Sequence, residues 1–305
     1  MTHHGSIHPF RQLCWNAFYA LFIGGLLLLA GTGCQTVPKA AHRNPFLLMG
    51  AHDVYVRFPV KSNEALAESL LNAYSPDISA DSRNTALARV STVYAGFDLD
   101  SAARVAPETF GELVVAGSFP RTALGSALRA KNGWTKIRYG AGICYRHNAA
   151  GIELYAGMPG TLCIAHDVSP MIVRAETSAE EGAFAAHGVP PQMTNTAFGS
   201  DVQFYVPRAA RFLPQDTQML LALLPGNIIA AASASGTLAK EAQTESYILS
   251  LDVNARHERA AAALLPLVSR MLDGDATATQ DGHILLYDIR LSVELLGSLA
   301  GGNTR

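Results

Sequence analysis

The sequence predicts an α+β protein made of two ferredoxin-like βαββαβ repeats, the first extended by an antiparallel β-meander. Segments in which apolar and polar residues alternate with a period of two, as in strands, are separated by segments of helical period. The order β-α-β-β-α-β occurs in residues 53–167 and again in 200–305. Both halves also open on a similar strand, DVYVRF at 53–58 and DVQFYV at 201–206. This order is that of the split βαβ motif, so we expect a duplicated fold.

The elements of the first half follow one another at short spacing. In the first strand, at 53–60, alternate residues are apolar, as expected for a half-buried strand: Val54, Val56, Phe58 and Val60. Ser62 or Asn63 can cap the next helix, whose apolar stripe is Leu66, Leu70 and Tyr74. We then expect a short helix at 85–89, strands at 89–97 and 112–119, a helix at 121–131 and a strand at 134–139.

The meander adds strands at 142–147, 151–156 and 161–165. Tyr139, Tyr145 and Tyr155 fall in successive strands, which favours a cross-strand packing ladder over an aromatic face that binds an apolar ligand. Cys144 and Cys163 lie in strands that a simple meander does not make neighbours. We therefore expect two buried free thiols, with a disulfide as the alternative.

Residues 168–199 form the predicted seam between the halves, with a helix expected at 178–187. In the second half we expect strands at 201–206, 227–233, 245–253 and 283–293, and helices at 218–224 and 254–272. Pro266 should kink the last helix. The final strand should direct alternate residues inward: Leu285, Tyr287, Ile289, Leu291 and Val293.

The N-terminal segment decides where the protein resides. No charged residue lies between Arg11 and Lys39, and the apolar run at 17–30 is short for a bilayer span, which needs about 20 residues. Small residues then precede Cys34, ending at Gly33. This segment resembles the signal of bacterial lipoproteins. The resemblance implies cleavage between Gly33 and Cys34 and acylation of the cysteine. An uncleaved anchor and ordinary secretion are the alternatives, and the glycines of the segment weaken a spanning helix.

The same resemblance divides the chain and locates it. Residues 1–33 are the predicted signal peptide and 34–52 a tether, so acyl chains on Cys34 would join the body to the membrane. In lipoproteins of Gram-negative bacteria an aspartate after the cysteine signals inner-membrane retention. Gln35 occupies that position here, which favours the outer membrane.

No motif of catalysis, cofactor binding or metal binding emerges. His52-Asp53 and His166-Asp167 are adjacent pairs, and adjacent side chains of a strand point to opposite faces. We therefore expect turn capping or solvation for both pairs. The other histidines are scattered, whereas zinc needs three or four converging ligands. No G-x-S-x-G or phosphate-binding glycine loop is present.

The net charge of −2 provides no electrostatic basis for nucleic-acid binding. We expect a membrane-anchored envelope lipoprotein with a non-enzymatic binding or structural role, whose partner is an envelope protein or a hydrophobic ligand. Two alternatives stay open: an envelope hydrolase whose site is assembled from distant residues, and a shuttle for a lipid or another hydrophobic molecule. The first would show converging titratable groups, and the second a deep apolar cavity.

Overall fold

The computed structural model describes residues 44–74, 79–98, 111–140, 142–177, 189, 193, 199–209, 233–241, 244, 246–255, 258–272, 276–279, 281–294 and 296. The predicted signal peptide, the first part of the tether and the helices predicted at 178–187 and 218–224 lie outside these residues. So does most of the strand predicted at 227–233.

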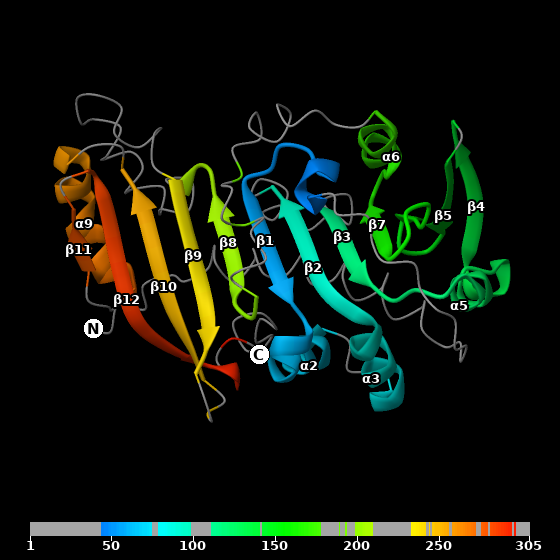
Figure 1. Cartoon of the computed structure of the whole chain (residues 1–305), viewed down its shortest axis with the longest axis horizontal. Helices are drawn as coiled ribbons and strands as arrows, with labels where there is room; N and C mark the ends of the chain where they lie inside the picture. The colour runs from blue at the N-terminus through cyan, green and yellow to red at the C-terminus, as the bar shows by residue number, and fades with distance from the viewer. Residues whose placement is uncertain are drawn as a thin grey trace.

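The described residues form an α+β fold with one large antiparallel sheet (Figure 1). Its strands are β1 (Val54–Pro59), β2 (Val90–Phe97), β3 (Glu112–Gly117), β4 (Trp134–Tyr139), β5 (Gly142–His147), β6 (Ile152–Tyr155), β7 (Thr161–Ala165), β8 (Val202–Val206), β9 (Ser233–Lys240), β10 (Ser246–Asn254), β11 (Ala276–Ala278) and β12 (His283–Ser292). The helices are α2 (Glu64–Tyr74), α3 (Ala80–Arg89), α5 (Arg121–Ala127), α6 (Ser169–Glu176) and α9 (Glu258–Leu272). Short 3₁₀ helices are η1 (Pro45–Leu48), η2 (Lys61–Asn63) and η4 (Ala130–Asn132). Within the described residues, no helix is both long and apolar enough to cross a bilayer.

The 12 strands of the described sheet follow the order β11-β12-β10-β9-β8-β1-β2-β3-β7-β6-β5-β4. The meander is confirmed, because β4 to β7 pair in succession. The two halves meet where β1 pairs with β8, with Val56 opposite Phe204. Asn63 adds a second link, because its side-chain amide donates to the carbonyl of Ser200 at 2.7 Å.

The strand order differs from the ferredoxin-like order that we predicted. In a split βαβ unit the strands joined by the helix are parallel and separated by another strand. Here β1 and β2 are direct antiparallel neighbours. The connection contains two helices, α2 and α3, which lie together beyond one end of these strands (Figure 1). A helical pair returns the chain to the end where β1 stopped, so β2 runs back alongside it.

Both faces of the central sheet are covered, which the prediction of a half-buried first strand did not anticipate. Val54 and Phe58 belong to a core that also includes Leu66, Leu70 and Leu264 of the helices. Tyr55 points to a second core, formed with residues of η1, α6, β3, β5 and β7. Phe46 of η1 is 1% exposed, although the sequence suggested an irregular tether at this point.

A β-bulge in β12 changes which of its side chains point toward the core. Leu249 pairs with Ile289, whereas Leu251 pairs with Leu286, so β12 carries one extra residue between these pairs. An extra residue reverses the alternation of faces. Ile284 and Leu286 are therefore the buried residues of the first part of β12. The prediction that Leu285 points inward is wrong for this reason.

The meander corrects one expectation about side chains and agrees with another. Tyr139 and Tyr155 pack on the second core, whereas Tyr145 packs on the first, so the three tyrosines do not share a face. Cys144 and Cys163 are both buried free thiols. Tyr155 of β6 lies between them, because it pairs with Cys144 of β5 on one side and with Cys163 of β7 on the other.

Candidate functional site: a buried ion-pair cluster around His52

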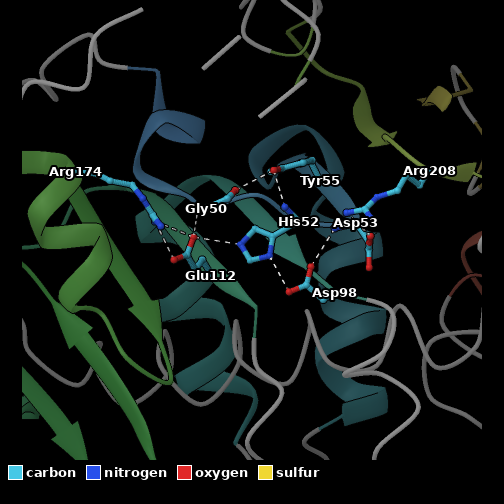
Figure 2. A network of polar contacts seen from close by, with 8 residues as sticks. All are labelled: Gly50, His52, Asp53, Tyr55, Asp98, Glu112, Arg174 and Arg208. Carbon is cyan, nitrogen blue, oxygen red and sulfur yellow. Dashed lines mark hydrogen bonds and ion pairs between the residues drawn. The ribbon is translucent and has the colours of Figure 1, made fainter. Parts of the chain in front are cut away.

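Five elements bring polar groups to one point beside the second core (Figure 2). The segment after η1 supplies Gly50 and His52, β1 supplies Tyr55, the end of β2 leads to Asp98, and the start of β3 supplies Glu112. Arg174 approaches from α6. The pairing of β1 with β2 and of β2 with β3 places these strand ends side by side.

His52 lies between two carboxylates. Its Nε2 is 3.2 Å from Glu112 Oε2 and its Nδ1 is 3.4 Å from Asp98 Oδ2. The first contact is a hydrogen bond, whereas the second is an ion-pair distance without hydrogen-bond alignment. The histidine side chain is only 9% exposed, and that of Asp98 is 49% exposed. A largely buried imidazole is therefore held between one largely buried and one half-exposed carboxylate.

Glu112 is the second node of the cluster and its side chain is 13% exposed. Arg174 Nη1 donates to Glu112 Oε1 at 2.9 Å and also to the carbonyl of Leu48 at 2.9 Å. The backbone N–H of Gly50 donates to Glu112 Oε2. One carboxylate thus joins α6, β3 and the segment after η1.

Tyr55 closes the turn that carries the histidine. Its hydroxyl accepts a hydrogen bond from the backbone N–H of His52 at 2.8 Å and donates one to the carbonyl of Gly50 at 2.9 Å. Its ring also lies against Phe46, with ring centroids 5.9 Å apart. Burial raises the pKa of Tyr55 to about 12, so the hydroxyl stays protonated and available as a donor.

The charge state of the cluster follows from these contacts. Burial alone would lower the pKa of His52, but the carboxylates of Asp98 and Glu112 outweigh it and raise the pKa from 6.5 to about 9. Burial would raise the pKa of Glu112, but hydrogen bonds from His52, Gly50 and Arg174 hold it below its usual value. His52 also lowers the pKa of Asp98. At neutral pH the cluster is therefore a charged imidazolium between two carboxylates.

Close packing limits movement of the ring. A Cβ added to Gly96 of β2 would lie 2.4 Å from Cδ2 of His52, so only glycine fits there without a shift. Asp53, next in sequence, points elsewhere: its Oδ1 lies 3.5 Å from Nη2 of Arg208 (Figure 2). The side chains of His52 and Asp53 therefore have different partners.

The prediction for the two His-Asp pairs holds for one of them. The Oδ1 of Asp167 accepts a hydrogen bond from the N–H of Ser169 at 2.8 Å, a turn contact at the start of α6, and His166 is exposed. His52, in contrast, is neither a cap nor solvated. Its partners Asp98 and Glu112 lie 46 and 60 residues further along the chain, and no local pattern in the sequence joins them.

Other sequence-based candidates are placed as follows. Cys34 and Gly33 lie outside the described residues, so the structure does not test the lipidation site. Within the described part of the chain, no group of three or more His, Cys, Asp or Glu side chains is arranged to hold a metal ion. Burial raises the pKa of Cys144 to about 11 and that of Cys163 to about 12, so neither thiol is reactive at neutral pH.

The arrangement acts chemically as a clamp. General-base catalysis needs an unprotonated group near neutral pH, and His52 is protonated there. Its Nε2 is hydrogen-bonded to Glu112, its Nδ1 lies at ion-pair distance from Asp98, and both glutamate oxygens accept hydrogen bonds from protein groups. The cluster therefore fastens η1 and α6 to the sheet.

Comparison with known proteins relates this fold to one family. The chain is similar to the solved structure "crystal form I of TP0453", with 20% identity, a TM-score of 0.58, and coverage of 84% of this chain and 96% of that one. For "crystal form III of TP0453" the values are 18%, 0.58, 86% and 98%. At these identities the likeness shows the fold alone. No curated protein matches the chain at a significant level.

The family model described as "Outer membrane-associated lipoprotein TP0453" matches residues 40–296, most of the chain. This match confirms the resemblance to bacterial lipoproteins and the predicted lipid-anchored location at the outer membrane. The chain belongs to the TP0453 family of outer membrane-associated lipoproteins.

Proposed function

We propose that this protein is held at the outer membrane by acyl chains on Cys34 and that its body has a non-enzymatic binding or structural role. The observation that carries the proposal is the position of the leader. Residues 11–34 have the pattern of a lipoprotein signal, and they lie just before residue 40, where the family match begins.

Acylation would explain durable attachment. Each buried methylene contributes about 0.8 kcal/mol, so one acyl chain binds a bilayer marginally and two or more bind it stably. The ten residue-to-residue steps from Cys34 to Asn44 can extend at most about 35 Å. The body would therefore stay close to the bilayer surface.

The charge states in the body support a non-catalytic role. The most converged group of titratable side chains among the described residues is the cluster around His52, and its members neutralise one another. The buried thiols have raised pKa values and make poor nucleophiles. Among the described residues, no observation favours the hydrolase or the shuttle.

We also infer that residues 53–167 and 200–305 are related by duplication, with residues 168–199 between them. The pairing of β1 with β8 supports this. The similar strands DVYVRF and DVQFYV pair antiparallel with Val56 opposite Phe204, which occupy the same position of the two motifs. Such pairing is expected when two equivalent halves meet about a twofold axis.

Metabolic labelling with a fatty-acid analogue tests the anchor. The parent should incorporate label and Cys34→Ala should not, whereas the control Cys14→Ala should label normally because Cys14 lies in the cleaved leader. Mass spectrometry should find a mature chain that begins at Cys34. Equal labelling of the parent and Cys34→Ala, or a mature chain that begins elsewhere, would remove the basis of the proposal.

A further inference from the structure

One long stretch of the chain has no acidic residue. Between Glu112 and Glu153 the sequence contains neither Asp nor Glu, although the whole chain has 25 of them and a net charge of −2. The cations of this stretch are Arg121, Arg129, Lys131, Lys136, Arg138 and Arg146. This stretch, which includes η4, β4 and β5, therefore carries only positive formal charge.

The structure gathers four of these cations at one end of the sheet. Arg129 immediately precedes the 3₁₀ turn η4, which contains Lys131 and leads into β4, and Lys136 and Arg138 lie on β4 itself. β4 is the terminal strand of the described sheet (Figure 1). All four side chains are exposed. We call this surface, formed by Arg129, Lys131, Lys136 and Arg138, the basic edge.

Among the described residues, these four cations have no carboxylate partner. No Asp or Glu of the described residues lies within ion-pair distance of any of them. Arg146 on β5 provides the contrast, because its Nη2 is 2.5 Å from Oε1 of the buried Glu153. Arg146 is therefore half exposed but ion-paired, whereas the cations of the basic edge are exposed and have no carboxylate partner among the described residues.

Apolar and aromatic groups share the face of Lys136 and Arg138. Lys136 pairs across the strands with Tyr145, and Arg138 with Ile143, so each pair projects to the same side of the sheet. Ile143 is 36% exposed, and among the described residues only it and Val173 are large hydrophobic residues that are exposed. Basic residues bind anionic headgroups, and aromatic and aliphatic groups beside them suit the interfacial layer of a bilayer.

We propose that the basic edge binds the surface of a bilayer that contains anionic lipids, so that the body docks on the membrane by its β4 end. The nearness of the membrane rests on the proposed anchor at Cys34, whereas the headgroup contact rests on the basic edge alone. Each cation near an anionic surface favours the bound state about fivefold.

The same side chains argue against a protein strand as the occupant. An edge strand exposes unpaired backbone groups, and lysine and arginine along it discourage pairing with another chain. A second copy of this protein would also bring its own basic edge against this one. Charge complementarity therefore selects a negatively charged, non-peptide surface.

Lysine footprinting of the acylated protein on vesicles tests the proposal. The protein is added to vesicles of phosphatidylcholine, alone or mixed with phosphatidylglycerol, and reacted with a membrane-impermeant amine reagent. Lys131 and Lys136 report on the basic edge. Lys61 and Lys240 are exposed lysines of η2 and β9 and are internal controls. Reaction at each lysine is read by mass spectrometry after proteolysis.

We expect Lys131 and Lys136 to react at least about fivefold more slowly on anionic than on neutral vesicles, since fivefold is the effect of one cation, while Lys61 and Lys240 react equally on both. High salt should remove the difference, because it screens exposed charges. The variant Lys136→Glu/Arg138→Glu should lose the protection at Lys131, and the control Lys240→Glu should keep it.

Equal reaction of Lys131 and Lys136 on the two kinds of vesicle would overturn the proposal. Protection that is independent of lipid charge and grows with protein concentration would also overturn it, since it indicates contact between copies. Sedimentation with neutral vesicles tests the acyl anchor separately. If the protein does not sediment with neutral vesicles, the acyl anchor is refuted, and lysine protection on the anionic vesicles still tests the basic edge.

Discussion

Replacing His52 with glutamine removes the positive charge from the centre of the cluster and retains a polar side chain. The pKa of His52 rises from 6.5 to about 9 on folding. One pKa unit corresponds to about 1.4 kcal/mol, which puts the contribution of the imidazolium at about 3 kcal/mol. Because Asp98 is 49% exposed, solvent screens its share, and we expect a loss of about 2 kcal/mol at pH 6.

The pH dependence of this contribution has a definite sign. A pKa raised on folding stabilises the folded protein fully below the unfolded value of 6.5, and the effect is lost as pH rises through about 9. The pKa values of Asp98 and Glu112 are lowered from 3.8 and 4.5, so their contribution is lost as pH falls below these values. The cluster should therefore stabilise the protein most between about pH 4.5 and 6.5.

Urea denaturation followed by circular dichroism at pH 6, 7, 8, 9 and 10 measures the effect. The difference in unfolding free energy between parent and His52→Gln should shrink from about 2 kcal/mol at pH 6 to nearly zero at pH 10. The control His166→Gln, at an exposed histidine, should behave as the parent does at every pH. A difference between parent and His52→Gln that does not change with pH would refute the reasoning.

Three further predictions concern the body. Glu153→Gln should lower the unfolding free energy by about 3 kcal/mol in urea titrations, because the buried carboxylate accepts from an arginine, a tyrosine and a backbone N–H; a loss below about 0.5 kcal/mol would contradict this. Cys144 and Cys163 should resist a thiol reagent in the native protein and react in urea, whereas fast native labelling would show that burial is incomplete. Gly96→Ala should cost about 1–3 kcal/mol by crowding the histidine ring. Gly125→Ala in α5 has open space and should be neutral or slightly stabilising, and equal losses at the two glycines would argue against a specific clash.

Most elements of the first half were predictable because their signals are local. Leu66 and Leu70 are buried on α2, as their helical spacing indicates, and β5 to β7 occur close to where turn residues and alternation placed them. The pairing partners were not predictable in this way. A period-two pattern identifies a strand and its two faces, but β1 could meet β2 directly only because two helices occupy the connection.

The cluster around His52 was missed for a related reason. Isolated in sequence, His52 has only Asp53 beside it, and strand geometry directs those side chains apart. Glu112 reaches the histidine because two successive antiparallel pairings return the chain to the same place. Arg174 reaches Glu112 from α6, in a stretch where the sequence suggested a seam.

The amino-acid sequence alone predicted a leader before Cys34, a location at the outer membrane and the alternation of strands and helices. Each of these predictions depends on residues that are adjacent in the sequence, and their hydrophobicity and size are known before the chain folds. Only the tertiary structure decided which strands pair, that His52 is a largely buried cation, and that four cations without a carboxylate partner among the described residues meet at one end of the sheet. Desolvation and Coulomb energy depend on distances in space, and those distances join residues that are far apart along the chain.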